Sequence, residues 1–324
     1  MRLQKAITSE DSVDLGEIHR GLEKVFQVST YLNFPLTLDE IATYFLPKAA
    51  VTGEELSSLI AEGHFHDIPF QLRGGYLFAS TIQSERERLE KERMSAAKLR
   101  SAAEFAAILT RSVPFIRTVA VTGSVAYGSA GKWDDIDLFI VTKQGRLWLS
   151  AFIALILVRI RKLLGLTPAY LSLFCLSYVH DEQGFARESQ KNRTNPLFAR
   201  ELLKARPIAG VNHYRKILEE NGWVANFYSK PYATSLKDLD NSISNPRTGS
   251  ENGPMRFPAS LFVDWAEALA FAFLSRYLQL KAYLTNLKLK SQGLGFRLFQ
   301  PNLSEASCVY TSNFYRWLQT LWGR

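Results

Sequence analysis

The sequence predicts an α+β fold in which a small mixed β-sheet is flanked by helices, with further helical regions before and after it. Two apolar, strand-like runs at 118–121 and 136–141 stand on either side of a loop of small residues. Long segments at 84–112 and 259–289 contain neither Gly nor Pro, as uninterrupted helices require. Hydrophobic residues make up 47% of the chain, which is enough for packed cores.

Residues 15–82 are expected to form a small helical unit that ends in a hairpin. Capping boxes at 37–40 and 52–55, each a Thr followed by Glu three residues later, predict two helix starts. Strand-like runs on both sides of the glycine pair at 74–75 predict a β-hairpin. Three helices and a hairpin are the elements of a winged helix, so we interpret this unit as a winged-helix-like domain.

The helix in the recognition position of such a domain, 52–62, carries three glutamates and no Lys or Arg. Neutralisation of phosphates supplies much of the affinity for DNA, so this charge argues against sequence-specific DNA binding. A role in protein interaction, or a purely structural one, is expected instead. The following segment, 83–112, mixes both charges with Ala and Leu and predicts a long connecting helix with i,i+4 ion pairs.

Residues 113–184 are expected to form the core that contains the β-sheet. Asp135 and Asp137 lie two residues apart in an apolar run. Side chains at i and i+2 of a strand point to the same face, so these two carboxylates are expected to project together, with Asp134 on the opposite face. Two carboxylates on one face of an apolar strand repel each other unless a cation binds them.

Oxygen ligands of this kind suit magnesium, which proteins bind through one or two carboxylates together with substrate phosphates. Gly123 and Ser124 follow the preceding apolar run, and a glycine bend lets backbone N–H groups approach a phosphate closely. Asp135 and Asp137 are therefore the candidate metal ligands, and Gly123 and Ser124 the candidate phosphate-binding residues. Lys132, in the intervening loop, is either a further phosphate contact or an exposed loop lysine.

These residues resemble the signature of the nucleotidyltransferase superfamily that includes DNA polymerase β. The run Val119-Ala120-Val121-Thr122-Gly123-Ser124 is followed, after a spacer of ten residues, by Asp135-Ile136-Asp137-Leu138. The resemblance is specific over roughly 115–143. It implies a nucleotidyltransferase core that transfers a nucleoside monophosphate from a nucleoside triphosphate to an acceptor and releases pyrophosphate. It also implies catalysis by Asp135 and Asp137 with Mg²⁺, or with Mn²⁺ as the alternative ion.

Members of this family usually carry a third carboxylate on a neighbouring strand. The best following strand here, 171–179, contains no acid. Asp181 lies just past its end, where it is either the third carboxylate or, as we favour, a solvated turn residue. Without a third acid the chain has an alternative function, as a catalytically weak or inactive nucleotide-binding regulatory protein that acts through its winged-helix region. The acceptor is open: a small molecule, a protein side chain or an RNA end.

The remaining segment, 185–324, is expected to be a helical region interrupted by a flexible loop at 235–258, where Ser, Asn, Gly, Pro and Asp predominate. Within the core, the apolar run 147–158 is too short to span a bilayer and is followed by Arg159, Arg161 and Lys162. We expect it to be a buried helix packed on the sheet, with attachment to a membrane surface as the secondary interpretation.

Bulk properties agree with a nucleotide-binding protein but do not single it out. The formal net charge is +8, which favours acidic partners and also fits an ordinary basic protein. The two cysteines, Cys175 and Cys308, offer neither a disulfide framework nor a thiolate metal site. Residues 1–10 are polar and show no secretory signal. These features predict a cytoplasmic protein without a transmembrane segment.

Overall fold

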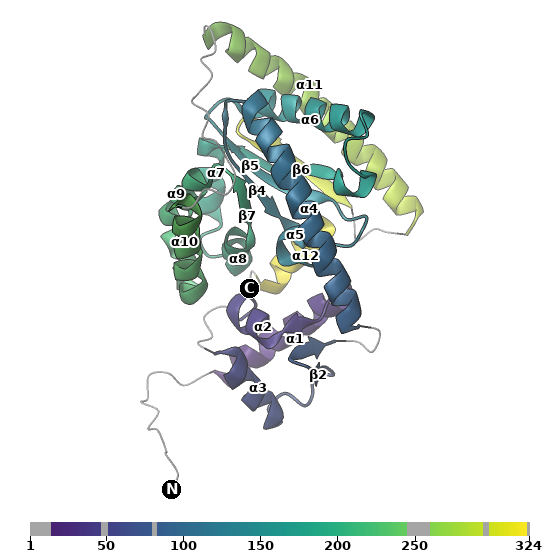
Figure 1. Ribbon diagram of the computed structural model, residues 1–324, viewed down its shortest axis with the longest axis vertical. Helices are drawn as coiled ribbons and strands as arrows, with labels where there is room; N and C mark the ends of the chain where they lie inside the picture. The colour runs from purple at the N-terminus through teal and green to yellow at the C-terminus, as the bar shows by residue number, and fades with distance from the viewer. Residues whose placement is uncertain (1–13, 47–50, 80–82, 245–259, 294–297, 323–324) are drawn as a thin grey trace. The chain divides into compact units, whose positions relative to one another are not determined.

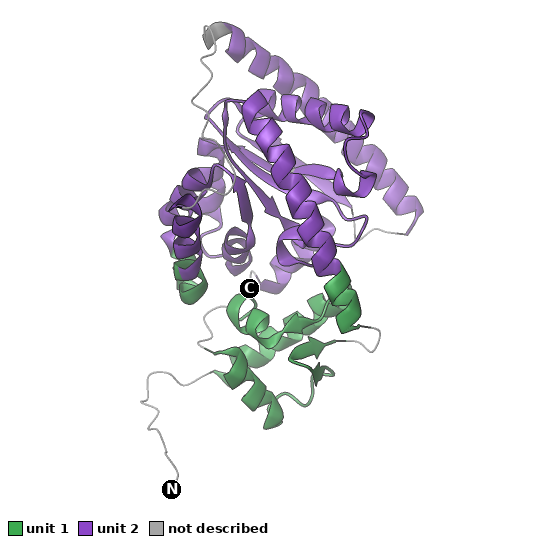
Figure 2. Cartoon of the chain, in the orientation of Figure 1, with its two compact units in different colours: residues 1–90, 223–233 green, residues 91–222, 234–324 purple. Residues whose placement is uncertain are grey.

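The computed structural model describes residues 14–46, 51–79, 83–244, 260–293 and 298–322 (Figure 1). Its contacts divide the chain into two compact units (Figure 2). The first comprises 1–90 and 223–233, and the second comprises 91–222 and 234–324. The boundary at 90/91 falls inside the helix α4 (Glu85–Ser112), the long helix that the sequence predicts over 83–112.

The first unit combines three helices with a three-stranded antiparallel sheet of order β1-β3-β2. Its elements are α1 (Leu15–Leu32), β1 (Leu36–Thr37), α2 (Leu38–Tyr44), α3 (Gly53–Ala61), β2 (Gln71–Arg73) and β3 (Tyr76–Phe78). Both expected capping boxes are present, at the starts of α2 and α3. Gly74 and Gly75 have φ angles of +57° and +80°, the left-handed values that the tight turn from β2 to β3 requires. The winged-helix assignment stays a prediction.

The second unit is built on a six-stranded mixed sheet of order β7-β4-β5-β6-β9-β8. The strands are β4 (Ile116–Thr122), β5 (Ile136–Thr142), β6 (Phe174–Asp181), β7 (Arg206–Ala209), β8 (Phe299–Ser304) and β9 (Ser307–Ser312). Only the β5–β6 pair is parallel, and the other neighbours are antiparallel. The α+β class and the mixed sheet expected from the sequence are thereby confirmed.

Helices cover both faces of this sheet (Figure 1). They are α5 (Gly123–Tyr127), α6 (Leu147–Leu163), α7 (Glu182–Lys191), α8 (Pro196–Lys204), α9 (Val211–Glu220), α10 (Ser229–Ser244), α11 (Ser260–Ser291) and α12 (Asn313–Trp322), with short 3₁₀ turns at Ala169–Leu171 and Gly222–Asn226. Ile136 and Leu138 of β5 are buried in the main core with Phe105 of α4. Phe139 points to the other face, where its ring centroid lies 5.4 Å from that of Phe185 in α7.

The C-terminal region is not purely helical, contrary to expectation, because it contributes three of the six strands. β7 and β8 are the two edges of the sheet, and each contains a proline, Pro207 and Pro301. Proline lacks the N–H that a central strand donates and is tolerated at an edge. A proline within a run of residues argues against a central strand, so the sequence does not reveal these two edge strands. The sheet therefore extends beyond the boundaries of 113–184.

The expected flexible loop over 235–258 is wrong for 235–244, which belong to α10. Leu239 is buried, and the Asp240 carboxylate pairs with the guanidinium of Arg215 in α9. These tertiary contacts stabilise a helix whose Ser- and Asn-rich sequence favours turns. The remainder of that expected loop, 245–258, lies outside the described residues.

Candidate functional site

The β4–β5 hairpin brings the glycine-serine bend, Gly123 and Ser124, next to the carboxylate of Asp137. Thr122, the last residue of β4, is paired with Asp137 of β5. Gly123 follows with φ of +63°, in the left-handed region. A Cβ atom on Gly123 would lie only 2.4 Å from Oδ2 of Asp137. The backbone at Gly123 therefore packs directly against the Asp137 carboxylate, and glycine is needed both for the φ angle and for the space.

Asp135 immediately precedes β5, and Asp137 is the second residue of that strand. Ile136, between them, is fully buried in the main core. Both carboxylates also act on one neighbouring group: burial raises the pKa of the Cys175 thiol, and the charges of Asp137 and Asp135 raise it further. Asp137 is also the register partner of Cys175 on the neighbouring strand β6. We call Asp135 and Asp137 the acid pair.

Two lysines distant in sequence lie near the acid pair. Burial raises the pKa of Asp135, whereas the charges of Lys281 and, next, Lys98 lower it. Lys281 comes from α11 and Lys98 from α4. Lys98 is fully buried, and its ammonium donates a hydrogen bond to the backbone carbonyl of Asp134. Burial lowers the pKa of Lys98, with Asp134 and Asp135 opposing that effect. No local pattern in the sequence connects either lysine to this site.

The loop before the acid pair is held by hydrogen bonds from its own backbone. Oδ2 of Asp134 accepts one from the N–H of Gly131 at 2.7 Å. The Ser95 hydroxyl of α4 accepts one from the N–H of Ala130 at 3.0 Å. Asp134 is thus engaged in shaping the loop, which agrees with the expectation that it is not the partner of Asp137.

Lys132 sits at an exposed aromatic pair next to this loop. Its ammonium lies 5.3 Å from the ring centroids of both Trp133 and Tyr170. The two rings meet edge to face, 6.3 Å apart, and Trp133 is 67% exposed. The arrangement is a cation–π cluster beside the acid pair, with an aromatic surface open to solvent.

Asp181 cannot complete the acid pair, because it lies at the opposite end of the sheet. The parallel register of β5 and β6 pairs Asp137 with Cys175 and Thr142 with Asp181. Five residues along a strand separate these two positions by about 16 Å. The place beside Asp137 on the neighbouring strand is therefore occupied by a cysteine.

Asp181 is also not the solvated turn residue that we favoured from the sequence. It is only 3% exposed and caps the start of α7. Its Oδ1 accepts a hydrogen bond from the N–H of Gly184 at 2.7 Å, and its Oδ2 accepts one from the N–H of Gly145 at 2.9 Å. Its function is structural, since it joins the start of α7 to the loop after β5.

The acid pair fits a hard cation in part. Carboxylate oxygens are the donors that Mg²⁺ prefers, and the pKa of Asp135, raised by burial, indicates a site where added positive charge is favourable. In the part of the chain that the structure describes, no group of three or more His, Cys, Asp or Glu side chains is arranged to hold a metal. A metal held by this pair would need further ligands from substrate phosphates or water.

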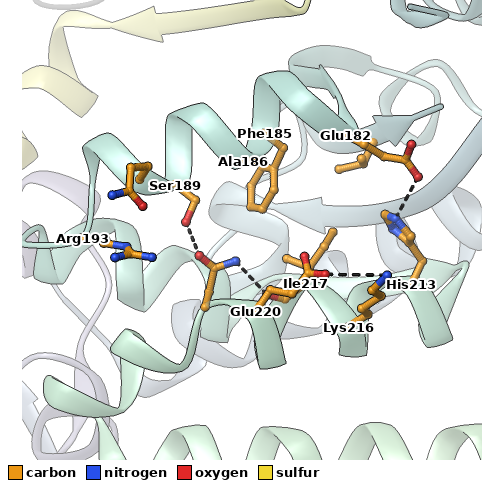
Figure 3. A pocket seen from close by; sticks show the side chains of 12 residues that line it. Glu182, Phe185, Ala186, Ser189, Arg193, His213, Lys216, Ile217 and Glu220 are labelled. Carbon is orange, nitrogen blue, oxygen red and sulfur yellow. Dashed lines mark hydrogen bonds and ion pairs between the residues drawn. The ribbon is translucent and has the colours of Figure 1, made fainter. Parts of the chain in front are cut away.

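A hollow lies between α7 and α9, away from the acid pair (Figure 3). It has a cavity volume of about 300 Å³ and is lined by Glu182, His213, Lys216 and Glu220 among others. Its charges are largely paired with one another: His213 lies 3.6 Å from Glu182 and Lys216 lies 3.7 Å from Glu220. Because Val141 of β5 also lines it, this hollow is about 13 Å along the strand from Asp137.

Comparison with known families agrees with this geometry. Residues 103–205 match the family model described as a nucleotidyltransferase domain. This segment is a nucleotidyltransferase domain. It contains the glycine-serine bend, the acid pair and Cys175, whereas Lys98 and Lys281 lie outside the matched residues. No curated protein and no solved structure matches the chain.

Proposed function

We propose that the protein is a metal-dependent nucleotidyltransferase that moves a nucleoside monophosphate from a nucleoside triphosphate to a hydroxyl acceptor. The observation that carries this proposal is the packing of Gly123 against the Asp137 carboxylate, with Asp135 two residues before Asp137, inside the segment that matches the nucleotidyltransferase domain. A bend that approaches phosphates and a pair of carboxylates that bind cations are the two parts that such a reaction needs in contact.

Asp135 and Asp137 are the proposed metal ligands and catalytic residues. Bound Mg²⁺, or Mn²⁺, would neutralise the triphosphate and stabilise the charge that develops on the leaving oxygen. Gly123 and Ser124 are proposed to hold the triphosphate through the backbone and the Ser124 hydroxyl. Lys281, whose charge already acts on Asp135, is proposed to compensate phosphate charge near that carboxylate.

The cation–π cluster suggests a second role for Lys132 besides a phosphate contact. The exposed Trp133 ring offers a flat surface next to the acid pair, on which a nucleobase or an aromatic acceptor would stack. Lys132, between Trp133 and Tyr170, would orient these rings and leave its charge available to a nearby phosphate.

In the proposed reaction, the acceptor oxygen bonds to the α-phosphorus, the bond from that phosphorus to pyrophosphate breaks, and the acceptor hydroxyl loses its proton. A third carboxylate would be the natural base for that proton. The residue beside Asp137 on β6 is Cys175, and the pKa of its thiol is raised, so it does not serve as a base at neutral pH. Proton removal then depends on Asp135, Asp137 or solvent.

The cysteine in this position favours a second candidate function. A domain that binds a nucleoside triphosphate but transfers slowly would act as a nucleotide-binding regulatory protein, with the winged-helix-like region passing the bound state to a partner. This alternative expects tight nucleotide binding without release of pyrophosphate. It also expects Cys175→Asp to gain pyrophosphate release, while Cys308→Ser, at the second cysteine of the chain, gains none.

The direct test measures pyrophosphate release from each of the four nucleoside triphosphates with Mg²⁺, alongside calorimetric nucleotide binding. Asp137→Asn and Asp135→Asn are expected to lower turnover by at least about 10²-fold, since loss of a metal ligand removes several kcal/mol of transition-state stabilisation. Asp134→Asn is the matched control, because an amide oxygen can still accept the hydrogen bond from Gly131. Equal turnover in the wild type and Asp137→Asn would remove the proposed metal role.

A further inference from the structure

Helix α11 has apolar residues on two sides, and only one of them is buried. The buried side packs into the core through Val263, Ala270, Leu274, Leu278 and Ala282. The other side is a second stripe of large side chains that are 47% to 75% exposed: Phe262, Trp265, Leu269, Phe273, Leu280, Tyr283, Leu284 and Leu287. Successive members are three, four or seven residues apart, except for the adjacent pair Tyr283 and Leu284, so they share one side of the helix. A helix that is apolar all round is normally covered.

Helix α6 lies parallel to α11 and extends this exposed surface (Figure 1). Residues near the start of α6 contact residues near the start of α11, and later residues contact later ones, so the two helices run in the same direction. Near their starts, Glu267 accepts hydrogen bonds from the N–H groups of Trp148 and Leu149. Further along, the guanidinium of Arg159 donates to the hydroxyl of Tyr277 at 3.1 Å. The end of α6 and the segment after it expose Ile156, Ile160, Leu163, Leu164 and Leu166.

We call the exposed apolar residues of α11 and α6 together the apolar face. The rings of Phe152 in α6 and Phe273 in α11 meet edge to face with centroids 6.1 Å apart, which joins the two halves. Thirteen large side chains, each about half exposed or more, leave on the order of 1,000 Å² of apolar surface. The largest exposed apolar patch of a typical monomer covers roughly 300–600 Å².

The charged residues of α6, and those of α11 after Glu267, are all basic. Neither α6 nor the part of α11 after Glu267 contains an acid. The exposed basic residues there include Arg159, Lys162, Arg276, Lys288 and Lys290. The two acids of α11 are engaged elsewhere: Asp264 pairs with Arg146 at 2.5 Å, and Glu267 caps α6. The apolar face therefore combines apolar and cationic groups without opposing carboxylates.

We propose that the apolar face binds the surface of a lipid bilayer that contains anionic phospholipid. Apolar side chains enter the boundary between headgroups and acyl chains while Lys and Arg contact the headgroups. Trp265 and Tyr283 belong to the residue types enriched at this boundary. A second copy of the chain would instead bring like charges together, because Arg276 lies within the stripe near the middle of α11. No helix among the described residues has the length and apolar content to cross the bilayer, so the two helices lie along its surface.

The test is co-sedimentation of the full chain with phosphatidylcholine vesicles that contain 0% or about 30% phosphatidylglycerol. Binding is expected only with the anionic vesicles, and it is expected to weaken in high salt. The double variant Trp265→Ser, Leu284→Ser is expected to weaken binding at least tenfold. The triple variant Arg276→Gln, Lys288→Gln, Lys290→Gln is expected to weaken it by about fivefold for each removed charge.

The control is Leu89→Ser with Ile108→Ser, which removes two apolar side chains of α4 that are each 40% exposed and lie outside the apolar face. This control is expected to bind vesicles as the wild type does. Absence of binding to anionic vesicles overturns the proposal, and so does equal binding by the wild type and both apolar-face variants. A wild-type dimer in sedimentation velocity that the serine variant dissociates, without any vesicle binding, would assign the apolar face to a second copy instead. Should the serine variant fail to fold, vesicle binding by the charge variant and the salt dependence of wild-type binding still test the proposal.

Discussion

Gly123→Ala tests the contact on which the site depends. The substitution adds a Cβ atom 2.4 Å from Oδ2 of Asp137. Ordinary C···O contacts are about 3.3 Å or longer, so the carboxylate or the bend must move by roughly 1 Å. Displacement of a catalytic group by about that distance costs about 10²-fold in rate. Alanine at a left-handed φ also costs about 1–2 kcal/mol of stability.

Gly145→Ala is the matched control for the second of these effects. Gly145 has φ of +64°, against +63° at Gly123, and a Cβ atom there would meet nothing within 4 Å. Its N–H, which donates to Oδ2 of Asp181, is retained in alanine. The control therefore carries the same backbone strain without displacing a carboxylate.

Urea unfolding and pyrophosphate release measured on both variants separate stability from geometry. Both are expected to lose about 1–2 kcal/mol of unfolding free energy from the left-handed φ alone. Only Gly123→Ala is expected to lose about 10²-fold in kcat/KM. Equal activity of Gly123→Ala and Gly145→Ala would refute the reasoning, because Asp137 would then not act from its position against the bend.

Three further predictions concern charge and capping. Lys281→Met removes a charge that lowers the pKa of Asp135, so the acid limb of the kcat/KM profile is expected to move to higher pH; an unmoved limb would separate Lys281 from the site. Burial lowers the pKa of His180 to about 3. As the pH falls, the imidazole is therefore protonated in the unfolded chain before it is protonated in the folded protein. The wild type is therefore expected to lose up to about 1.4 kcal/mol of stability per pH unit below about pH 6.5. His180→Phe should lack this part of the pH dependence when the unfolding free energy is measured in urea at pH 7.5 and pH 5. An unchanged difference between the two pH values would count against the role of His180. Glu267→Ala removes the carboxylate that accepts hydrogen bonds from the N–H groups of Trp148 and Leu149. We expect this substitution to cost about 1–2 kcal/mol of unfolding free energy. A cost near zero would show that the Glu267 cap contributes nothing to stability.

Features that depend on neighbours in the chain could be predicted from the sequence. The capping boxes at α2 and α3 form because their donors and acceptors are three residues apart. The alternation that predicts a shared side for Asp135 and Asp137 is likewise a local property of a strand. Long helices such as α4 and α11 follow from composition without Gly or Pro.

Features that depend on distant segments could not be predicted. β7 and β8 are strands only because the sheet supplies a paired neighbour, and each contains a proline, a residue that argues against a strand in the sequence. The helix α10 owes its burial at Leu239 to partners that its own composition does not reveal. Lys98 and Lys281 reach the acid pair through the packing of helices against the sheet.

The sequence by itself determined the chemistry of this protein: which residues carry carboxylates, where the chain bends at glycine, and where the long helices α4 and α11 run. Tertiary structure alone decided what stands next to that chemistry. The register of β5 and β6 places Cys175 beside Asp137 and moves Asp181 to the far end of the sheet. Strand register is set by the packing of whole elements, and a shift of one residue would exchange every neighbour, so no local pattern encodes it.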